Sequence, residues 1–182
     1  RSLLATGLIA SATFVIVAVG ASRLSPDMDI EKPSGGAGGF SLAAESTVPL
    51  PYDINSAEGR ASLGISGEAA AICEGASFAA FRVRPGDDSS CLNLYKVNQP
   101  RILGAGEEFL ERGAFSFAAS MAESAEEKTN PWLLLNKQFD DGAIPAIGDE
   151  SAVRWLLHLD IGGDMEITDE RGQSQRLRIV AM

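Results

Sequence analysis

The densest group of reactive side chains in the sequence lies in PGDDSSCLNLY, residues 85–95. Asp87 and Asp88 are adjacent carboxylates, which can bind Ca²⁺ or Mg²⁺ or serve as a general acid when other ligands converge on them. Cys91 adds a thiol, which is a nucleophile only beside a base. Pro-Gly opens the stretch, however, and Asp and Ser side chains satisfy the backbone of tight turns. We therefore interpret the stretch as a turn, with metal binding as the alternative and catalysis the least favoured.

The rest of the sequence offers little else for catalysis. His158 is the single histidine and ends a predicted amphipathic helix, where the helix dipole favours an imidazolium. A Ser-His-Asp triad would need it, yet the sequence has neither a Gly-x-Ser-x-Gly elbow nor a His-Glu-x-x-His motif. The acidic pairs 140–141 and 149–150 lie beside Gly, as turn residues do. We expect no catalytic residues, no cofactor and no metal.

Cys73 and Cys91 are the two cysteines of the chain. Outside the cytoplasm a pair of cysteines can form a disulfide, worth roughly 3 kcal/mol for a loop of this length. Two separate buried thiols are the equally weighted alternative.

The composition limits the partners. The 182 residues are 45% hydrophobic and carry a formal net charge of -10. This acidic excess argues against nucleic acid and against docking on anionic lipid through a basic face.

The first 23 residues determine the compartment. Between Arg1 and Arg23 there is no charged residue, and about 20 apolar residues of helix cross a bilayer. We interpret 1–23 as a transmembrane helix. A signal peptide cleaved near Val19-Gly20-Ala21 and a buried helix of a soluble protein remain alternatives. The first two interpretations place the remainder outside the cytoplasm.

Residues 24–39 are predicted to be a flexible linker, because they contain Pro26, Pro33 and the Gly35–Gly39 cluster. No Gly-Lys-Ser/Thr follows these glycines, so they are not a phosphate-binding loop.

Residues 40–182 predict an α+β domain with helices on a mixed or antiparallel sheet. Asn55 is the expected N-cap of a helix that closes a capping box with Glu58 and ends at Gly64. Phe81 and Val83 are expected to face inward from a half-buried strand, and a hairpin over 160–182 is expected to set Met165 and Ile167 against Leu177 and Ile179. The predicted strands are 40–50, 77–86, 100–104, 114–118 and 142–149; the predicted helical segments are 53–64, 107–113, 121–130 and 149–159. Asn130-Pro131 is expected to start another turn, and residues 132–136 are expected to be buried.

Four stretches together resemble the FtsX/MacB-type permeases of ABC transporters: RSLLATGLIASATFVIVAVGA, GGFSLAAESTVPLPYDINSAEG, RPGDDSSCLNLYKVNQPRILG and AIPAIGDESAVRWLLHLDIGGDMEITDERGQSQRLRIVAM. They are similar to the first transmembrane helix of such a permease and the first part of the outer core domain that follows it. The departure is Gly162-Gly163 before Asp164, where the family pattern has one Gly. In this resemblance the signature turn consists of Pro85, Gly86, Asp87, Asp88, Cys91, Asn93 and Tyr95.

The resemblance implies a mechanical function in the bacterial inner membrane, with residues 24–182 in the periplasm and the domain over 40–182 incomplete. The implied partners are a separate cytoplasmic ATPase, the other transmembrane helices of a dimeric permease, and a protein or lipid cargo. Two other interpretations stay open: an anchored outer binding or sensor domain without a transport role, and a secreted metal-dependent hydrolase that uses Asp87, Asp88 and Cys91.

Overall fold

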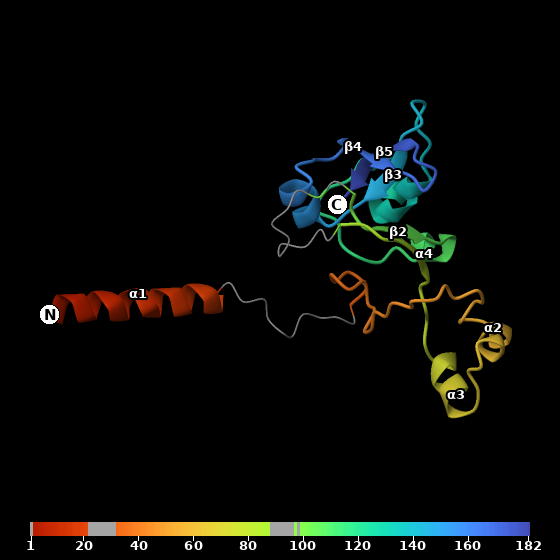
Figure 1. The fold of residues 1–182 in the computed structure, drawn as a ribbon, viewed down its shortest axis with the longest axis horizontal. Helices are drawn as coiled ribbons and strands as arrows, with labels where there is room; N and C mark the ends of the chain where they lie inside the picture. The colour runs from red at the N-terminus through yellow and green to blue at the C-terminus, as the bar shows by residue number, and fades with distance from the viewer. Residues whose placement is uncertain (1, 22–31, 88–96, 98) are drawn as a thin grey trace.

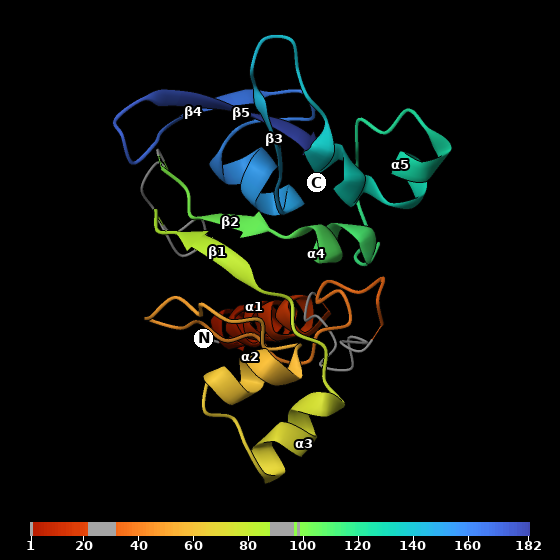
Figure 2. The ribbon, with the colours of Figure 1, turned by 90° about the vertical axis from the view of Figure 1, so that its right-hand side faces the viewer.

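The computed structural model describes residues 2–21, 32–87, 97 and 99–182 (Figure 1). The chain has a mixed α+β fold with an apolar N-terminal helix, as the sequence predicts. In chain order the elements are α1 (Ser2–Ala21), α2 (Ala57–Ser62), α3 (Glu68–Glu74), β1 (Phe81–Arg84), β2 (Ile102–Ala105), α4 (Glu107–Glu111), α5 (Ala125–Thr129), η1 (Pro131–Asn136), β3 (Ile144–Ile147), η2 (Ala152–Leu156), β4 (Asp164–Thr168) and β5 (Ser174–Ala181). Figures 1 and 2 show three tiers, with α1 extending away from them.

The first tier is a mixed sheet with strand order β3-β5-β4 among the described residues. β5 runs parallel to β3 and antiparallel to β4. Met165 lies opposite Leu177, as predicted, but Ile167 lies opposite Gln175 rather than Ile179. Ile179 instead exchanges hydrogen bonds with the Gly162-Gly163 segment, because β4 begins only at Asp164.

The end of β5 holds the core of this tier. Val180 and Ala181 are fully buried and pack with Leu134 of η1. Beyond the start of β4, residues 118–121 pair with the same edge of β5: the Met121 amide donates to the Val180 carbonyl, and the Met182 amide donates to the Ala119 carbonyl. The burial of apolar side chains on both sides of β5 makes this strand the centre of the fold.

The predicted strand over 114–118 is therefore wrong, because sheet pairing is limited to the Ser120–Ala181 bridge and its flanking hydrogen bonds. Phe115 has a φ of 77°, a left-handed conformation that interrupts an extended strand. Its amide donates to the Pro33 carbonyl instead of to a neighbouring strand.

The middle tier consists of the antiparallel pair β1–β2 together with α4. The predicted inward face of β1 is wrong at Val83, which is 41% exposed while Arg84 is half-buried, whereas Phe81 of the same face packs its ring edge to face on buried Phe109. The Arg84 guanidinium is half-buried because it donates hydrogen bonds to the Thr168 carbonyl at the end of β4 and to the Gln99 side chain. These bonds tie the middle tier to the sheet.

The third tier is the lobe of α2 and α3. A helix lies within the predicted range 53–64 but spans only Ala57–Ser62, and Gly64 follows its end with a φ of 75°. Its N-cap is Ser56, whose hydroxyl accepts from the Gly59 amide, and not Asn55. The Asn55 side chain is occupied with both backbone groups of Phe78, which fasten the lobe to the chain leading into β1.

The predicted strand over 40–50 is also wrong. Residues 41–52 are exposed and pair with no described strand, and Pro49 and Pro51 cannot donate to a ladder. Their β-branched and apolar side chains match a strand, but a strand forms only where a partner and a core face exist. The result is an exposed, extended connection.

Part of the predicted linker packs on the folded tiers. Residues 32–39 form successive turns, and Gly38 is buried with a φ of 60°. A Cβ placed on Gly38 would overlap the Phe115 ring. Gly38 thus allows the turns of residues 32–39 to pack directly on the Phe115 ring.

Short helical segments complete the sheet layer. α5 carries the capping box of Ser124 and Glu127, and η1 begins with Pro131 at its first turn. In η2, Val153 is 1% exposed whereas Trp155 is 74% exposed, so the predicted amphipathic character is present. His158 follows with a φ of 54°, at the end of the helical turn where it was expected.

Candidate functional site

The structure describes only the first part of the predicted signature turn. Pro85 and Gly86 do not form the expected turn; they lead from the end of β1 to Asp87, which forms an isolated bridge with Pro100. The Asp87 amide donates to the Gln99 carbonyl at 2.6 Å, and its carboxylate accepts from the Gln99 amide at 3.0 Å. A Cβ on Gly86 would overlap this neighbouring backbone, which explains the glycine. Asp87 thus has a structural role in holding two segments together.

The remaining residues of that stretch, Asp88, Cys91, Asn93 and Tyr95, lie outside the described residues. The disulfide between Cys73 and Cys91 therefore stays a prediction. Within the described part of the chain, no three His, Cys, Asp or Glu side chains gather in a way that could hold a metal ion.

The acidic pair 140–141 enters an ion-pair network on the sheet. The Asp141 carboxylate lies 2.8 Å from Arg178 and 3.0 Å from Arg176, and Asp164 lies 2.6 Å from Arg178. The Arg178 side chain donates hydrogen bonds to both carboxylates and thereby lowers the pKa of Asp141 and the pKa of Asp164. The Arg178 guanidinium also lies over the Phe139 ring, 4.7 Å from its centroid. The charges of these side chains compensate one another, and their ion pairs connect β4 and β5 to the turn before β3.

The pair 149–150 begins a helical segment. The Asp149 carboxylate accepts from the Ala152 amide, and Glu150 pairs with Arg154 one turn later. The Asp149 side chain thus bonds to the nearby backbone, which agrees with the interpretation of the acidic pairs as turn residues.

An aromatic cluster joins the tiers, and the sequence did not reveal it. Phe109 of α4 contacts Phe81 and Trp132 edge to face, both at 4.8 Å between ring centroids. Phe40 and Phe115 complete this contact with Phe109, and Phe117 packs on Trp132. The Trp132 indole donates to the Ala114 carbonyl at 2.8 Å. Four segments far apart in sequence are thus packed around Phe109 and Trp132.

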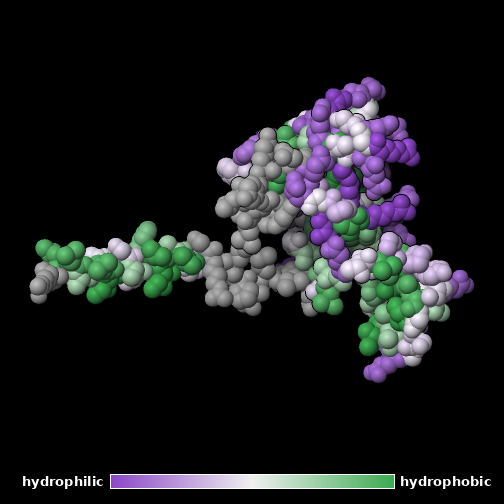
Figure 3. All heavy atoms as spheres, in the orientation of Figure 1, coloured by the Kyte–Doolittle hydropathy of each residue, from purple (hydrophilic) through white to green (hydrophobic). Residues whose placement is uncertain are grey.

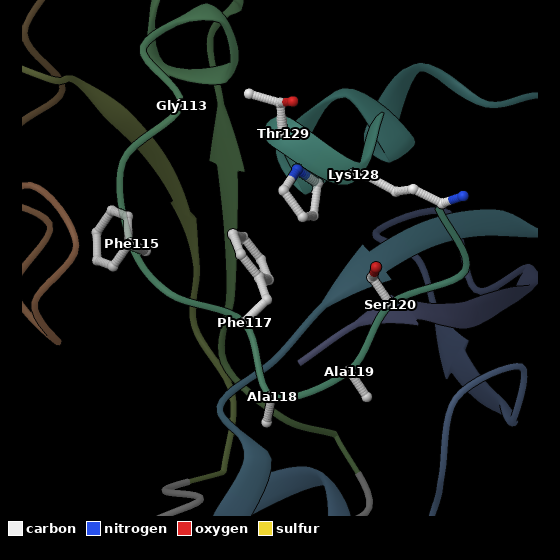
Figure 4. Close-up of a pocket in the computed structure, with 9 residues that line it drawn as sticks. Gly113, Phe115, Phe117, Ala118, Ala119, Ser120, Lys128 and Thr129 are labelled. Atoms are coloured by element: carbon white, nitrogen blue, oxygen red, sulfur yellow. The ribbon is translucent and has the colours of Figure 1, made fainter. Parts of the chain in front are cut away.

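Beside this cluster lies a pocket of about 330 Å³ (Figure 4). Its floor is the arch of residues 113–120, and the junction of α5 with η1 covers it. The lining residues are Gly113, Phe115, Phe117, Ala118, Ala119, Ser120, Lys128, Thr129 and Pro131.

Two polar residues of the pocket have groups without partners. Lys128 forms no ion pair with any described residue, in contrast to the paired arginines of the sheet. The amide, carbonyl and hydroxyl of Ser120 likewise form no hydrogen bond within the described ranges. In Figure 4 the Ser120 hydroxyl points toward the side of the arch where the Lys128 side chain runs. The pocket therefore offers donors and one positive charge.

Sequence reasoning missed both pocket residues. Ser120 and Lys128 belong to no motif, and they come together only because residues 118–121 pair with the distant strand β5. Comparison with protein-family models, curated proteins and solved structures finds no match for this chain. A function for this chain is therefore inferred from its sequence and from the geometry of its helix and pocket.

Proposed function

We propose that this chain is the membrane-anchored outer portion of an FtsX/MacB-type ABC transporter permease. The observation that carries the proposal is α1. Its segment Leu3–Ala21 is long and apolar enough to span a membrane, and none of it is buried inside the molecule. Figure 3 shows its hydrophobic side chains extending away from the folded tiers. An apolar helix that the protein does not cover needs another apolar surrounding, which a bilayer supplies.

The architecture suits a transmitter of motion. In the proposal, residues 22–39 connect α1 to a periplasmic α+β domain, and a separate cytoplasmic ATPase drives the helices of a dimeric permease in the inner membrane. The turns of residues 32–39 support this proposal, because they pack against Phe115 and would carry movement of the anchor to the aromatic cluster. The domain then acts on a lipid, peptide, lipoprotein or drug.

A second candidate is an anchored outer binding or sensor domain without transport. The observation that favours it is the pocket under α5, with its unpaired Lys128 and Ser120 groups. The two candidates share the anchor and differ in whether an ATPase partner exists.

The anchor is tested by placing two arginines in α1, Phe14→Arg with Val17→Arg, in the full chain expressed in bacteria. Each arginine near the centre of a membrane helix costs about 2.5–3.5 kcal/mol of insertion free energy. We expect the wild-type chain to stay in the membrane pellet after an alkaline wash and the variant to be released. Leu42→Arg with Val48→Arg is the matched control, since both residues are exposed and apolar but lie outside α1.

Intact mass of the membrane-bound chain distinguishes an anchor from a cleaved signal peptide. Retention of residues 2–21 supports the anchor, and their loss contradicts it. Co-purification with an ABC-type ATPase of the host organism, from solubilised membranes, then separates the two candidates. An anchored chain that binds no ATPase would favour the sensor.

A further inference from the structure

We infer that the pocket under α5 binds a small carboxylate ligand through Ser120 and Lys128. The inference does not depend on the proposed transport role, because all of the pocket lies in the α+β domain.

The pairing with β5 determines where the Ser120 backbone points. Ala119 and Met121 use their carbonyl and amide, respectively, to bond the β5 edge. In an antiparallel pair the residue between two such positions directs its own amide and carbonyl to the opposite side. The Ser120 amide therefore points away from β5 and is available as a donor, together with its hydroxyl.

Lys128 supplies the charge. It lies near the end of α5 and its side chain runs along the pocket opposite Ser120 (Figure 4). The nearest acidic competitor in sequence, Glu127, is engaged: its carboxylate accepts from the amides of Glu123 and Ser124 at 2.9 Å. These bonds lower the pKa of Glu127 and keep its charge at the start of α5. The ammonium is thus left for an external anion.

The donor set selects the ligand class. One ammonium, one hydroxyl and one amide match the single negative charge and two acceptor oxygens of a carboxylate. A phosphate would favour the planar fork of an arginine, and no arginine lines the pocket. Phe117 and Pro131 also line the pocket and offer apolar surface to a short aliphatic chain attached to the charged head.

The test titrates propionate into the ¹⁵N-labelled full chain in detergent and follows the amide resonances of Ala119 and Ser120. We expect saturable shifts with a dissociation constant on the order of 1 mM, as suits a ligand of few atoms. Lys128→Met should weaken binding at least about tenfold, since it removes a charged hydrogen bond. Lys128→Arg should retain binding within about threefold, because a cation remains. Lys137→Met, which removes a lysine outside the pocket, should leave binding unchanged.

Two further titrations define the outcomes that overturn the inference. Propionamide has the same shape without the charge and should bind at least about tenfold more weakly than propionate. Equal binding of propionamide would overturn the inference, and so would tighter binding of inorganic phosphate. Absence of shifts at Ser120, or a Lys128→Met variant that binds like the wild type with an otherwise unchanged spectrum, would also overturn it.

Discussion

At the scale of single residues, two left-handed backbones support one another. Phe115 has a φ of 77° and Gly38 a φ of 60°, and the two residues lie in contact. A left-handed aromatic residue is strained by about 1–3 kcal/mol, so its surroundings must hold it. Two contacts hold Phe115 in this conformation. Its amide donates a hydrogen bond to the Pro33 carbonyl, and its ring packs edge to face on Trp132. The glycine leaves the space that the Phe115 ring fills.

We predict that Gly38→Ala lowers the free energy of unfolding by about 1–3 kcal/mol, because a Cβ would overlap the Phe115 ring on a backbone that favours glycine. Thermal unfolding of the full chain in detergent, followed by near-ultraviolet circular dichroism, measures the change. Gly36→Ala is the matched control and should stay within about 0.5 kcal/mol, since nothing lies within 4 Å of its added Cβ. Equal stability of the two variants would contradict the proposed fit between Gly38 and Phe115.

At the scale of elements, the ion-pair network joins β4 and β5 to the turn before β3. Arg178 and Arg176 extend from β5, Asp164 begins β4, and Asp141 precedes β3. Since the folded pKa of Asp164 lies below its unfolded value of about 3.9, the pair stabilises the fold above that pH. The stabilisation is lost as the pH falls through the folded pKa.

We therefore predict that the melting temperature falls between about pH 5 and pH 2, and that Asp164→Asn reduces this acid-dependent part of the fall. The variant should also be less stable than the wild type at neutral pH, because Arg178 loses a charged partner. Asp140→Asn is the control: among the described residues Asp140 forms no ion pair with Arg176 or Arg178, so this variant should show the same acid-dependent fall as the wild type. An Asp164→Asn profile that parallels the wild type would show that the pair does not couple stability to pH.

Elements with local signals were predictable from sequence. α4 lies between acidic residues and Gly113, and η1 starts at an Asn-Pro step, so both were found. Segments 40–50 and 114–118 were mistaken for strands because alternating apolar residues do not reveal whether a partner strand exists. For the same reason the pocket was missed: Ser120 acquires its free donors through pairing with β5, far along the chain.

At the scale of the whole molecule, burial is uneven. Val180 and Ala181 at the end of β5 are fully buried, whereas α3 contains no buried residue and Ile72 is 69% exposed. Figure 3 shows hydrophobic side chains on the surface of the α2–α3 lobe. Segments with few buried apolar contacts unfold locally at a lower free-energy cost than segments in the core.

We predict that hydrogen–deuterium exchange is slowest for the amides of β5 and fastest, among the helices other than α1, for those of α3. The free energy of opening should approach the global value in β5 and be close to zero in α3. Mass spectrometry of peptides from the full chain in detergent measures both. Comparable protection of the two elements would indicate a cover over α3 that the described residues do not provide.

The central position of β5 also has a consequence in time. This strand, which completes the sheet, is synthesised about 160 residues after α1 ends. At roughly 5–20 residues per second, the helix is finished about 8–30 s before the sheet can close. During that interval the chain between them lacks its central strand and cannot hold the apolar core together. The apolar helix is therefore complete and exposed while the domain is still unfolded.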